Sequence, residues 1–341
     1  MGKEEPILVA VHCLVYNHEP YLRDCFDGFV MQKTNFRFVV IVHEDCSTDN
    51  SKTIICEYGA KYPDIFRPIY ETENQWHKTD GSLDGIMNEA IEATGAKYIA
   101  ICEGDDFWVD AFKLQKQVNY MEAHPKIGLC YTDFNFYYEN SRVFKEALFK
   151  NGMHRSVDFE DHLLTRGYIG PMTWLMRKDT YKMVYPKSTH SDGSFALALE
   201  FYAKSKVAYI DEVTATYRIH DNSASRPDSL EKKWQYVCGI MQTQLEYARK
   251  YGNDAMVQKV YINSYLVDLL PLAVALKKQD FIMEAREYTE QFGFKFDNYL
   301  TIISASLKNE KQYNQVQHSK AYRLGKFLLK PFRWMKKARS K

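Results

Sequence analysis

The sequence predicts an α/β protein with a mostly parallel sheet, helices on both faces of that sheet, and a helical region after it. Short apolar runs alternate with segments of helical spacing through about the first 135 residues. These runs are apolar at nearly every position, as in strands that are buried on both sides. Beyond residue 230, apolar residues recur every three or four positions, which indicates helices up to about residue 319.

The individual elements follow from the same spacing. Apolar runs predict strands at 7–12, 36–43, 65–70, 97–102 and 128–132. Amphipathic spacing predicts helices at 21–31, 51–61, 83–93 and 111–124. Less regular patterns predict a hairpin at 139–154, strands at 173–176, 207–210 and 213–217, and a helix at 195–203. The predicted division of the chain is a sheet domain at 1–228, a helical region at 229–319 and a basic tail at 320–341.

Composition narrows the classes of function. Residues 320–341 carry nine Lys or Arg and no acidic residue, which leaves 36 basic and 44 acidic residues in the rest of the chain. A body this acidic is a poor binder of nucleic acid, so we expect no nucleic-acid partner. The seven cysteines form no CxxC pair, which favours free thiols in a reducing compartment. We see no signal peptide and no apolar run of 18 residues, so we expect a cytoplasmic protein.

Polar segments follow three of the predicted strands. They read LVYN at 14–17, EDCS at 44–47 and EGDD at 103–106. Ligands of parallel α/β sheets bind beyond the carboxyl ends of the strands, at a switch point of the strand order. Parallel strands would therefore deliver all three segments to one edge of the sheet, where they would form a binding site.

The EGDD segment places three acidic residues behind a buried strand. Carboxylates this close repel one another, and a bound cation is the usual compensation. Mg²⁺ and Mn²⁺ take oxygen ligands, commonly one or two carboxylates together with phosphate oxygens of a substrate. The competing interpretation is a helix N-cap by Asp106 or Asp110. Two adjacent aspartates beside Glu103 favour the cation site over the cap.

The other polar segments carry weaker signals. Glu44 and Asp45 directly follow a strand and could accept hydrogen bonds from a ribose or a base, although Ser/Thr/Asp clusters also make ordinary turns. Tyr16 could stack on a base or simply pack. Asp192 precedes the helix predicted at 195–203, where it could act as a base or as an N-cap. Arg218 and His220 alternate along a predicted strand, and an arginine near phosphates would be reasonable.

The order of five motifs resembles that of the family 2 glycosyltransferases, which have the GT-A fold. The motifs are LVYN at 14–17, VHEDCSTDNS at 42–51, ICEGDDFW at 101–108, SDGSF at 191–195 and TYRIH at 216–220. The resemblance covers about residues 6–226, two thirds of the chain. One departure is Glu44-Asp45-Cys46, which stands where the family usually has Asp-Asp-Gly.

The resemblance implies an inverting transfer of a sugar from a nucleotide-sugar, UDP-linked, to a glycan or lipid-linked acceptor in bacterial surface polysaccharide synthesis. It implies a divalent cofactor, Mn²⁺ or Mg²⁺, and a catalytic base at Asp192. The implied nucleotide-binding residues are Leu14, Tyr16, Glu44, Asp45 and Asp105, and the implied metal ligands are Asp105, Asp106 and His220. Two alternatives stay open. A sugar-nucleotidyltransferase would need a basic, Gly-rich phosphate loop near the N-terminus, which we do not find, and a degenerate transferase fold could serve as a non-catalytic scaffold.

The basic tail interleaves its cations with apolar and aromatic residues, in HSKAYRLGKFLLKPFRWMKKARSK. This pattern is typical of amphipathic segments that lie on an anionic membrane surface. A solvated tail that packs partly on the body is the alternative. The sequence therefore predicts peripheral attachment to the inner face of the plasma membrane.

Overall fold

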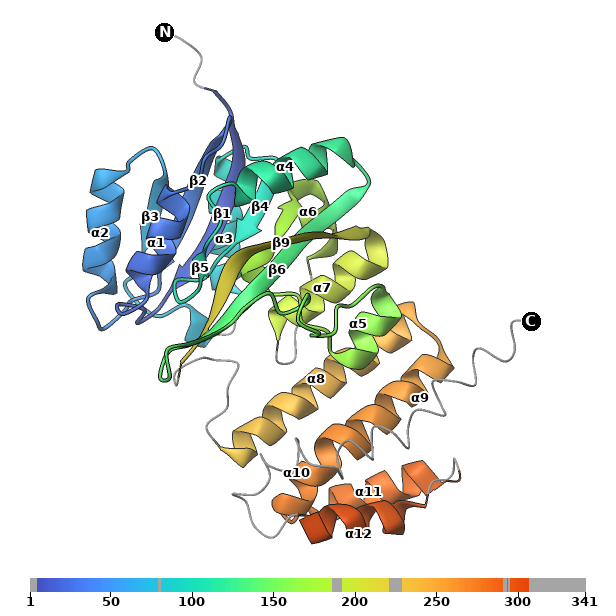
Figure 1. Cartoon of the computed structure of the whole chain (residues 1–341). Helices are drawn as coiled ribbons and strands as arrows, with labels where there is room; N and C mark the ends of the chain where they lie inside the picture. Colours follow the sequence, from blue (N-terminus) through green and yellow to red (C-terminus); the bar gives the residue numbers. More distant parts are fainter. Residues whose placement is uncertain are drawn as a thin grey trace. The chain divides into compact units, whose positions relative to one another are not determined.

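The computed structural model describes residues 5–78, 81–185, 192–220, 229–290, 293 and 295–306. The chain forms two compact units, of which the first spans 1–159, 167–187 and 194–221 and the second spans 160–166, 188–193 and 222–341 (Figure 1). The predicted boundary at residue 228 and the basic tail at 320–341 both lie outside the described residues. Within those ranges, no helix is both long enough and apolar enough to cross a membrane.

The described part of the first unit holds one nine-stranded sheet, in the order β3-β2-β1-β4-β8-β6-β9-β5, with β7 paired to β6. The strands are β1 (Ile7–Val15), β2 (Arg37–Glu44), β3 (Phe66–Tyr70), β4 (Tyr98–Ile101), β5 (Phe107–Trp108), β6 (Ile127–Tyr138), β7 (Val143–Lys145), β8 (Leu175–Arg177) and β9 (Lys206–Ile219). β1 runs parallel to both β2 and β4, and β2 runs parallel to β3. β8 and β5 join antiparallel. The mixed, mostly parallel sheet predicted from the sequence is confirmed.

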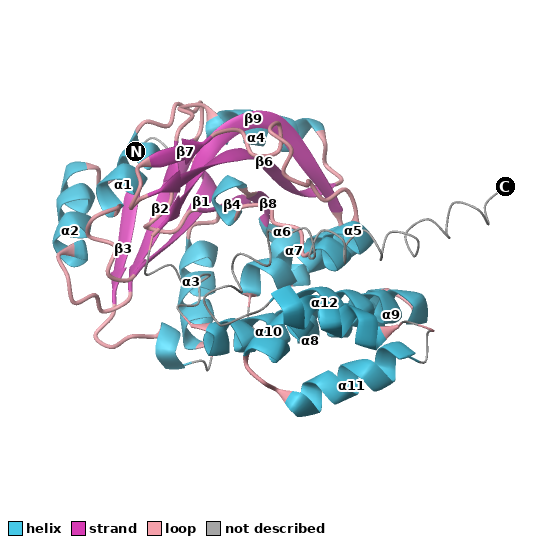
Figure 2. Cartoon of the chain, turned by 60° about the horizontal axis from the view of Figure 1, so that its bottom comes forward, coloured by secondary structure: helices cyan, strands magenta, loops and turns pink. Residues whose placement is uncertain are grey.

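Helices cover both faces of this sheet (Figure 2). One face packs against α1 (Leu22–Val30), α2 (Ser51–Lys61) and α4 (Lys113–Ala123). The other packs against α3 (Ser82–Ala93), α6 (Lys178–Val184) and α7 (Gly193–Lys204). Two short turns of 3₁₀ helix, η1 (Trp76–Lys78) and η2 (Pro171–Thr173), complete the described helical elements of this unit. The continuous apolar character of β1, β2 and β4 follows from this burial on both sides.

Three strands differ most from the sequence prediction. β6 continues to Tyr138, where the sequence predicts a strand only at 128–132. β9 is one strand of 14 residues, where the polar pair Asp211-Glu212 predicts a break between two short strands. It pairs in parallel with β6, and irregular register near Asp133 accommodates the interruption. β5 has two residues and carries no strand pattern of its own, but it pairs Phe107 with Thr216 of β9.

The second unit is helical, as predicted for the region after residue 229. Its elements are most of α5 (Phe159–Thr165), then α8 (Leu230–Tyr251), α9 (Asp254–Ile262), the π-helical η3 (Asn263–Leu269), α10 (Leu270–Ala275), α11 (Gln279–Glu290) and α12 (Phe296–Ser306). Ser229 and Asn253 cap α8 and α9, because their side chains accept hydrogen bonds from the first-turn amides. The apolar faces of these helices close on a core that includes Leu266, Leu270 and Phe296.

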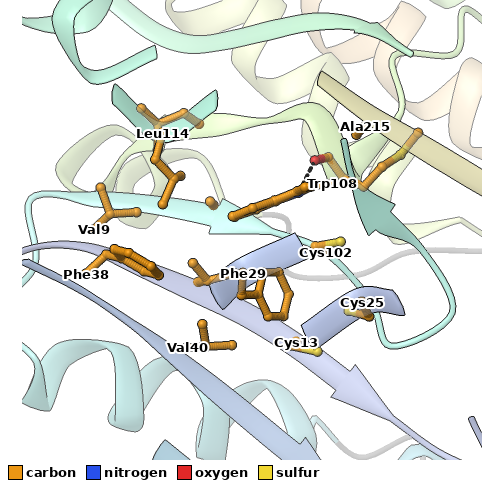
Figure 3. Close-up of a cluster of buried hydrophobic side chains, with 14 of the residues drawn as sticks. Val9, Cys13, Cys25, Phe29, Phe38, Val40, Cys102, Trp108, Leu114 and Ala215 are labelled. Carbon is orange, nitrogen blue, oxygen red and sulfur yellow. Dashed lines mark hydrogen bonds between the residues drawn. The ribbon is translucent and has the colours of Figure 1, made fainter. Parts of the chain in front are cut away.

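Trp108 anchors the segment that follows the acidic motif. Its ring packs edge-to-face on Phe29 with centroids 4.8 Å apart, and its Nε1 donates to Met172 O at 2.9 Å (Figure 3). A Cβ at Gly28 would lie 2.9 Å from Trp108 N, so only glycine lets α1 approach β5 this closely. The Phe107-Trp108 end of the motif is therefore a packing anchor, and it fixes where the preceding aspartates stand.

Three cysteine side chains, Cys13, Cys25 and Cys102, lie in the same core (Figure 3). Cys25 Sγ donates to Glu103 O at 3.4 Å, which ties α1 to the acidic loop. Burial raises the pKa of the Cys25 and Cys102 thiols, so both stay neutral. All seven cysteines of the chain are free, as the sequence predicts.

Lys113 is a buried cation at the start of α4. Its Nζ donates to Gln117 Oε1 at 2.7 Å and lies 4.4 Å from the Trp108 ring centroid. Burial lowers the pKa of Lys113 from 10.5 to about 8, so between these values the unfolded chain binds a proton that the folded chain does not. The free energy of unfolding therefore gains a contribution that rises with pH in this window.

We predict a pH-dependent stability gap between the wild type and Lys113→Met. The free energy of unfolding of the wild type, minus that of Lys113→Met, should increase by up to about 1.4 kcal/mol per pH unit between about pH 8 and 10.5. Denaturant unfolding at pH 7.5, 8.5 and 9.5 measures it. Lys116→Met is the matched control, because hydrogen bonds to Asp110 and Glu212 raise the Lys116 pKa. The difference in free energy of unfolding between the wild type and Lys116→Met should therefore not change with pH below pH 10. A flat gap for Lys113→Met would contradict the prediction.

Candidate active site

The parallel strands bring the three polar segments to one edge of the sheet, as the sequence predicts. Val15 pairs with Glu44, so β1 and β2 end side by side. The chain leaving β4 continues along β1, because Cys102 N donates to His12 O and Gly104 N donates to Leu14 O, both at 3.0 Å. The EGDD segment is thus held against the end of β1 by main-chain hydrogen bonds.

The first two segments are tied together by reciprocal hydrogen bonds. Asn17 N donates to Ser47 Oγ at 3.0 Å, and Asn17 Oδ1 accepts from Thr48 N at 2.8 Å. Glu19 accepts from both the main-chain and side-chain nitrogens of Asn50. The Ser, Thr, Asp and Asn residues that could have been ordinary turn formers therefore fix two loops, 31 residues apart, as one rigid rim of the site.

Glu44 and Asp45 are buried, and their carboxylates are used inside the protein. Glu44 Oε1 accepts from Ser47 N at 2.6 Å. Asp45 Oδ1 accepts from Gln75 N at 2.6 Å, and its Oδ2 accepts from Trp76 N at 3.1 Å. Both acids thus shape the rim and position the segment around residue 75. A nucleoside could contact only the lone pairs that these bonds leave free.

Two aromatic side chains near Asp45 are exposed. Tyr16 follows β1 directly and is 39% exposed, while Trp76 is 62% exposed. Trp76 was not predicted from the sequence, where it stands as a single aromatic residue within a polar stretch, ETENQWHKTDGS. Leu14, predicted to bind nucleotide, lies within β1, and its carbonyl accepts the hydrogen bond from Gly104.

Asp105 and His220 meet, although 115 residues separate them. Antiparallel pairing of β5 with the end of β9 brings the two segments together, and His220 Nε2 lies 3.1 Å from Asp105 Oδ2. The His220 side chain is buried, and the Tyr21 ring lies against it with centroids 4.6 Å apart. Two of the three predicted metal ligands are therefore direct neighbours.

The third, Asp106, is buried and accepts a hydrogen bond at Oδ1 from Arg218 N at 2.9 Å. Burial and the neighbouring Asp105 carboxylate raise the pKa of Asp106 well above its usual value. Burial acts in the same direction on Asp105, but its hydrogen bond with His220 and the charge of His18 lower the Asp105 pKa overall. The pKa values of the two adjacent carboxyls therefore differ, and Asp105 ionises more readily than Asp106.

The residues present fit a divalent ion of the Mg²⁺ or Mn²⁺ type. The described residues contain no cluster of three or more His, Cys, Asp or Glu arranged as a metal cage. Such an ion is not usually held in a cage, because it takes one or two protein ligands and fills its other positions with water and phosphate oxygens. Asp105 Oδ2 and His220 Nε2, which are adjacent donors on one edge of the sheet, supply that number.

His18 also belongs to this site, although the sequence did not predict it. Its amide donates to Ser51 Oγ at 2.9 Å, and its ring packs on Gly104. Its Nδ1 is buried and has no hydrogen-bond partner. Burial lowers the pKa of the His18 imidazole, which also feels the charge of Asp105. The feature of the sequence that could have indicated His18 is its position two residues after Tyr16, directly after the LVYN segment.

We predict that Gly104→Ala displaces the acidic loop. The added Cβ would lie 2.8 Å from His18 Nδ1, 3.0 Å from Val15 Cγ2 and 3.1 Å from Leu22 Cδ1, so several packed groups would have to shift together. We expect Mn²⁺-dependent nucleotide binding to weaken at least about tenfold, since small displacements of positioned groups are costly. Titration calorimetry measures it, with Gly85→Ala as control because nothing lies within 4 Å of its Cβ position. Equal affinities would refute the packing argument.

Asp192, predicted as the catalytic base, directly precedes α7. Its Oδ2 accepts a hydrogen bond from Tyr236 Oη at 3.1 Å, and both residues belong to the second unit. The role of Asp192 stays a prediction.

Comparison with known proteins places the chain in a family. The family model described as "Glycosyl transferase family 2" matches residues 11–184, half of the chain. A Mycobacterium tuberculosis protein, Rv1520, is 32% identical over 220 residues, which are 62% of this chain and 59% of that protein. The chain thus spans about three fifths of the length of this relative. The putative teichuronic acid biosynthesis glycosyltransferase TuaG of Bacillus subtilis is 24% identical over 67% of this chain and 83% of its own.

Solved structures show the same fold. Residues 1–349 of TarS from S. aureus, in complex with UDP-GlcNAc, superpose with a TM-score of 0.60 at 17% identity, over 94% of this chain and 92% of that chain. The mannosyltransferase PcManGT from Pyrobaculum calidifontis, in complex with GDP-Man and Mn²⁺, superposes with a TM-score of 0.54 at 14% identity, over 88% and 85%. The fold is the GT-A fold of these glycosyltransferases, and the chain belongs to glycosyl transferase family 2.

Proposed function

We propose that the chain is an inverting glycosyltransferase that moves a sugar from a UDP-linked donor to a glycan or lipid-linked acceptor. The observation that carries the proposal is the Asp105–His220 pair, which stands at the sheet edge beside the rim formed by the first two loops. Family membership favours this reading over a sugar-nucleotidyltransferase. The nucleotide-sugars bound by TarS and PcManGT support a donor of that class.

In this proposal the chain holds the donor at the edge of the sheet. Asp105 and His220 would hold a divalent ion, which would supply positive charge to offset that of the departing nucleotide diphosphate. Asp106, next to them, completes the acidic side of the same subsite. Tyr16 stacks on the nucleobase, while Glu44 and Asp45 keep the rim in shape and contact the nucleoside through their remaining lone pairs. The Mn²⁺ bound by PcManGT supports the choice of ion.

The acceptor hydroxyl would lose its proton to the Asp192 carboxylate. Its oxygen attacks the anomeric carbon while the bond from that carbon to the diphosphate oxygen breaks. Attack from the face opposite the leaving nucleotide inverts the anomeric configuration, as in inverting hydrolases. The proton stays on Asp192 until solvent removes it, and the electron pair of the broken bond leaves with the diphosphate.

We place the reaction in surface polysaccharide synthesis, at the cytoplasmic side of the membrane. The similarity to a putative teichuronic acid glycosyltransferase supports this setting. The basic tail, 320–341, would provide the attachment, since it combines nine cations with interleaved aromatic and apolar residues.

We predict that a chain truncated after Gln317 loses binding to anionic vesicles. About 1 kcal/mol per basic residue near an anionic surface makes nine cations a strong attachment. Co-sedimentation with vesicles of phosphatidylglycerol and phosphatidylcholine measures it, and vesicles of phosphatidylcholine alone are the control. Equal sedimentation of the full and truncated chains would contradict the prediction.

The experiment that tests the proposed function is a donor screen. The full chain is incubated with Mn²⁺ and each of several UDP- and GDP-linked sugars, together with candidate glycan acceptors. We expect one donor to yield free nucleotide diphosphate in step with a glycosylated product, and NMR of that product to show the inverted anomeric configuration. A product with the retained configuration would refute the proposed mechanism.

A further inference from the structure

The sequence suggests that Arg218 lies near the phosphates of a ligand, but its side chain makes its contacts within the protein. Its side chain is 3% exposed and lies among three aromatic rings, those of Tyr21, Phe107 and Tyr137, at 4.9–5.3 Å from the guanidinium carbon to the ring centroids. An arginine that reaches for a diphosphate would need its donors turned to the open site. Here the aromatic rings and the surrounding hydrogen bonds hold the guanidinium in place.

Arg218 contacts both aspartates of the acidic loop. Its amide donates to Asp106 Oδ1 and its Nε donates to Asp105 O, each at 2.9 Å. The first bond fixes a carboxylate, and the second fixes the main chain one residue earlier. Because both donors belong to one residue, the orientation of the Asp105-Asp106 pair is set relative to β9, the strand that also delivers His220.

The remaining donors of Arg218 reach two further elements. Nη2 forms an ion pair with Asp24 of α1 at 2.6 Å, and Nη1 forms one with Glu139, directly after β6. Two carboxylates therefore balance the guanidinium charge within the protein. Each of its three nitrogens is engaged, and the planar group joins the acidic loop, α1 and the end of β6.

From these contacts we propose that Arg218 is a positioning residue, which fixes the Asp105-Asp106 loop for the donor and acts only through that loop. The inference rests on the proposed function in one respect, because it takes the loop to hold the donor diphosphate. A lysine would keep the positive charge. Its single ammonium could not contact the main-chain carbonyl of Asp105 and the carboxylates of Asp24 and Glu139 at the same time. Arg218→Lys thus separates a role of geometry from a role of charge.

Two readouts test the inference on the full chain. Hydrogen exchange of the peptide covering 102–108 measures how firmly the loop is held. Donor turnover with Mn²⁺ measures whether the position of the loop matters for sugar transfer. We expect Arg218→Lys to exchange at least about tenfold faster in that peptide, with the rest of the sheet unchanged. We expect its kcat for sugar transfer to fall about 10²-fold, as displaced catalytic groups do, while the KM for the acceptor stays within about threefold.

The matched control is Arg23→Lys, which removes the guanidinium of an exposed arginine in α1 that is paired with Glu57 at 2.7 Å. It should change neither readout. Asp24→Asn removes one carboxylate partner of Arg218 and should give a smaller change of the same kind. The double variant Asp24→Asn with Arg218→Lys should lose no more kcat, and gain no more exchange at 102–108, than Arg218→Lys alone. Both substitutions act on the same interaction, so their effects should not add.

Unchanged exchange at 102–108 in Arg218→Lys would overturn the inference, whatever the enzyme does. Faster exchange with unchanged kcat would overturn it too, because the loop position would then not matter for transfer. If the wild type turned over no nucleotide-sugar, the proposed function would fail instead, and nucleotide diphosphate binding with Mn²⁺ would replace turnover as the second readout. The failures of the two proposals are therefore distinguishable.

Discussion

Asp105→Asn is expected to lower sugar transfer by about 10²- to 10³-fold, the usual cost of removing one group that stabilises charge in a transition state. The substitution keeps the size of the side chain and an oxygen that can face His220, but it removes the charge that would hold the divalent ion. Initial rates of nucleotide diphosphate release measure the effect. Raising the Mn²⁺ concentration should recover part of the lost rate, because the ion would be bound more weakly rather than excluded.

Glu103→Gln is the matched control for this prediction. Glu103 belongs to the same loop, but it is exposed and precedes the two aspartates. Its rate should stay within about threefold of the wild type, as is usual for surface substitutions. If Glu103→Gln lost more activity than Asp105→Asn, the assignment of the ion to Asp105 and His220 would be wrong.

Asp192→Asn is expected to lower kcat by about 10²- to 10⁴-fold, the range for the loss of a general base. The KM for the donor should stay close to that of the wild type, because this residue is proposed to act on the acceptor hydroxyl. Steady-state kinetics with varied donor and acceptor separate the two parameters. Tyr236→Phe removes the hydrogen bond to Asp192 but leaves the carboxylate, so a much smaller loss is expected.

Normal transfer by Asp192→Asn would show that another group takes the proton. It would leave the donor site intact as a proposal, since none of the donor contacts involves Asp192. A wild-type chain that binds donor but never transfers sugar would instead favour the non-catalytic scaffold.

The sheet edge could be predicted because its cause is local. β1, β2 and β4 read as apolar runs, and each is followed at once by polar residues. Parallel strands then place those residues together without any knowledge of side-chain contacts. The GT-A fold could be predicted from five short motifs in a fixed order, three of which lie at the ends of these strands.

The contacts within the site could not be predicted because they join distant segments. Arg218 meets the acidic loop through β5, a strand of two residues with no pattern of its own. Each carboxylate oxygen of Asp45 accepts a hydrogen bond from an amide 30 or 31 residues later, and its sequence position behind a strand did not predict these bonds. The position of the His18 ring could not be predicted either, because the ring packs on Gly104, which is 86 residues away in the sequence.

The most direct test of the central claim is a calorimetric titration of the full chain with UDP and with GDP, each with and without Mn²⁺. The account predicts that one nucleotide, UDP, binds only when Mn²⁺ is present, and that Asp105→Asn weakens this binding at least about tenfold while Glu103→Gln does not. Binding of neither nucleotide with any divalent ion, or UDP binding that is equally tight without metal and in Asp105→Asn, would contradict it.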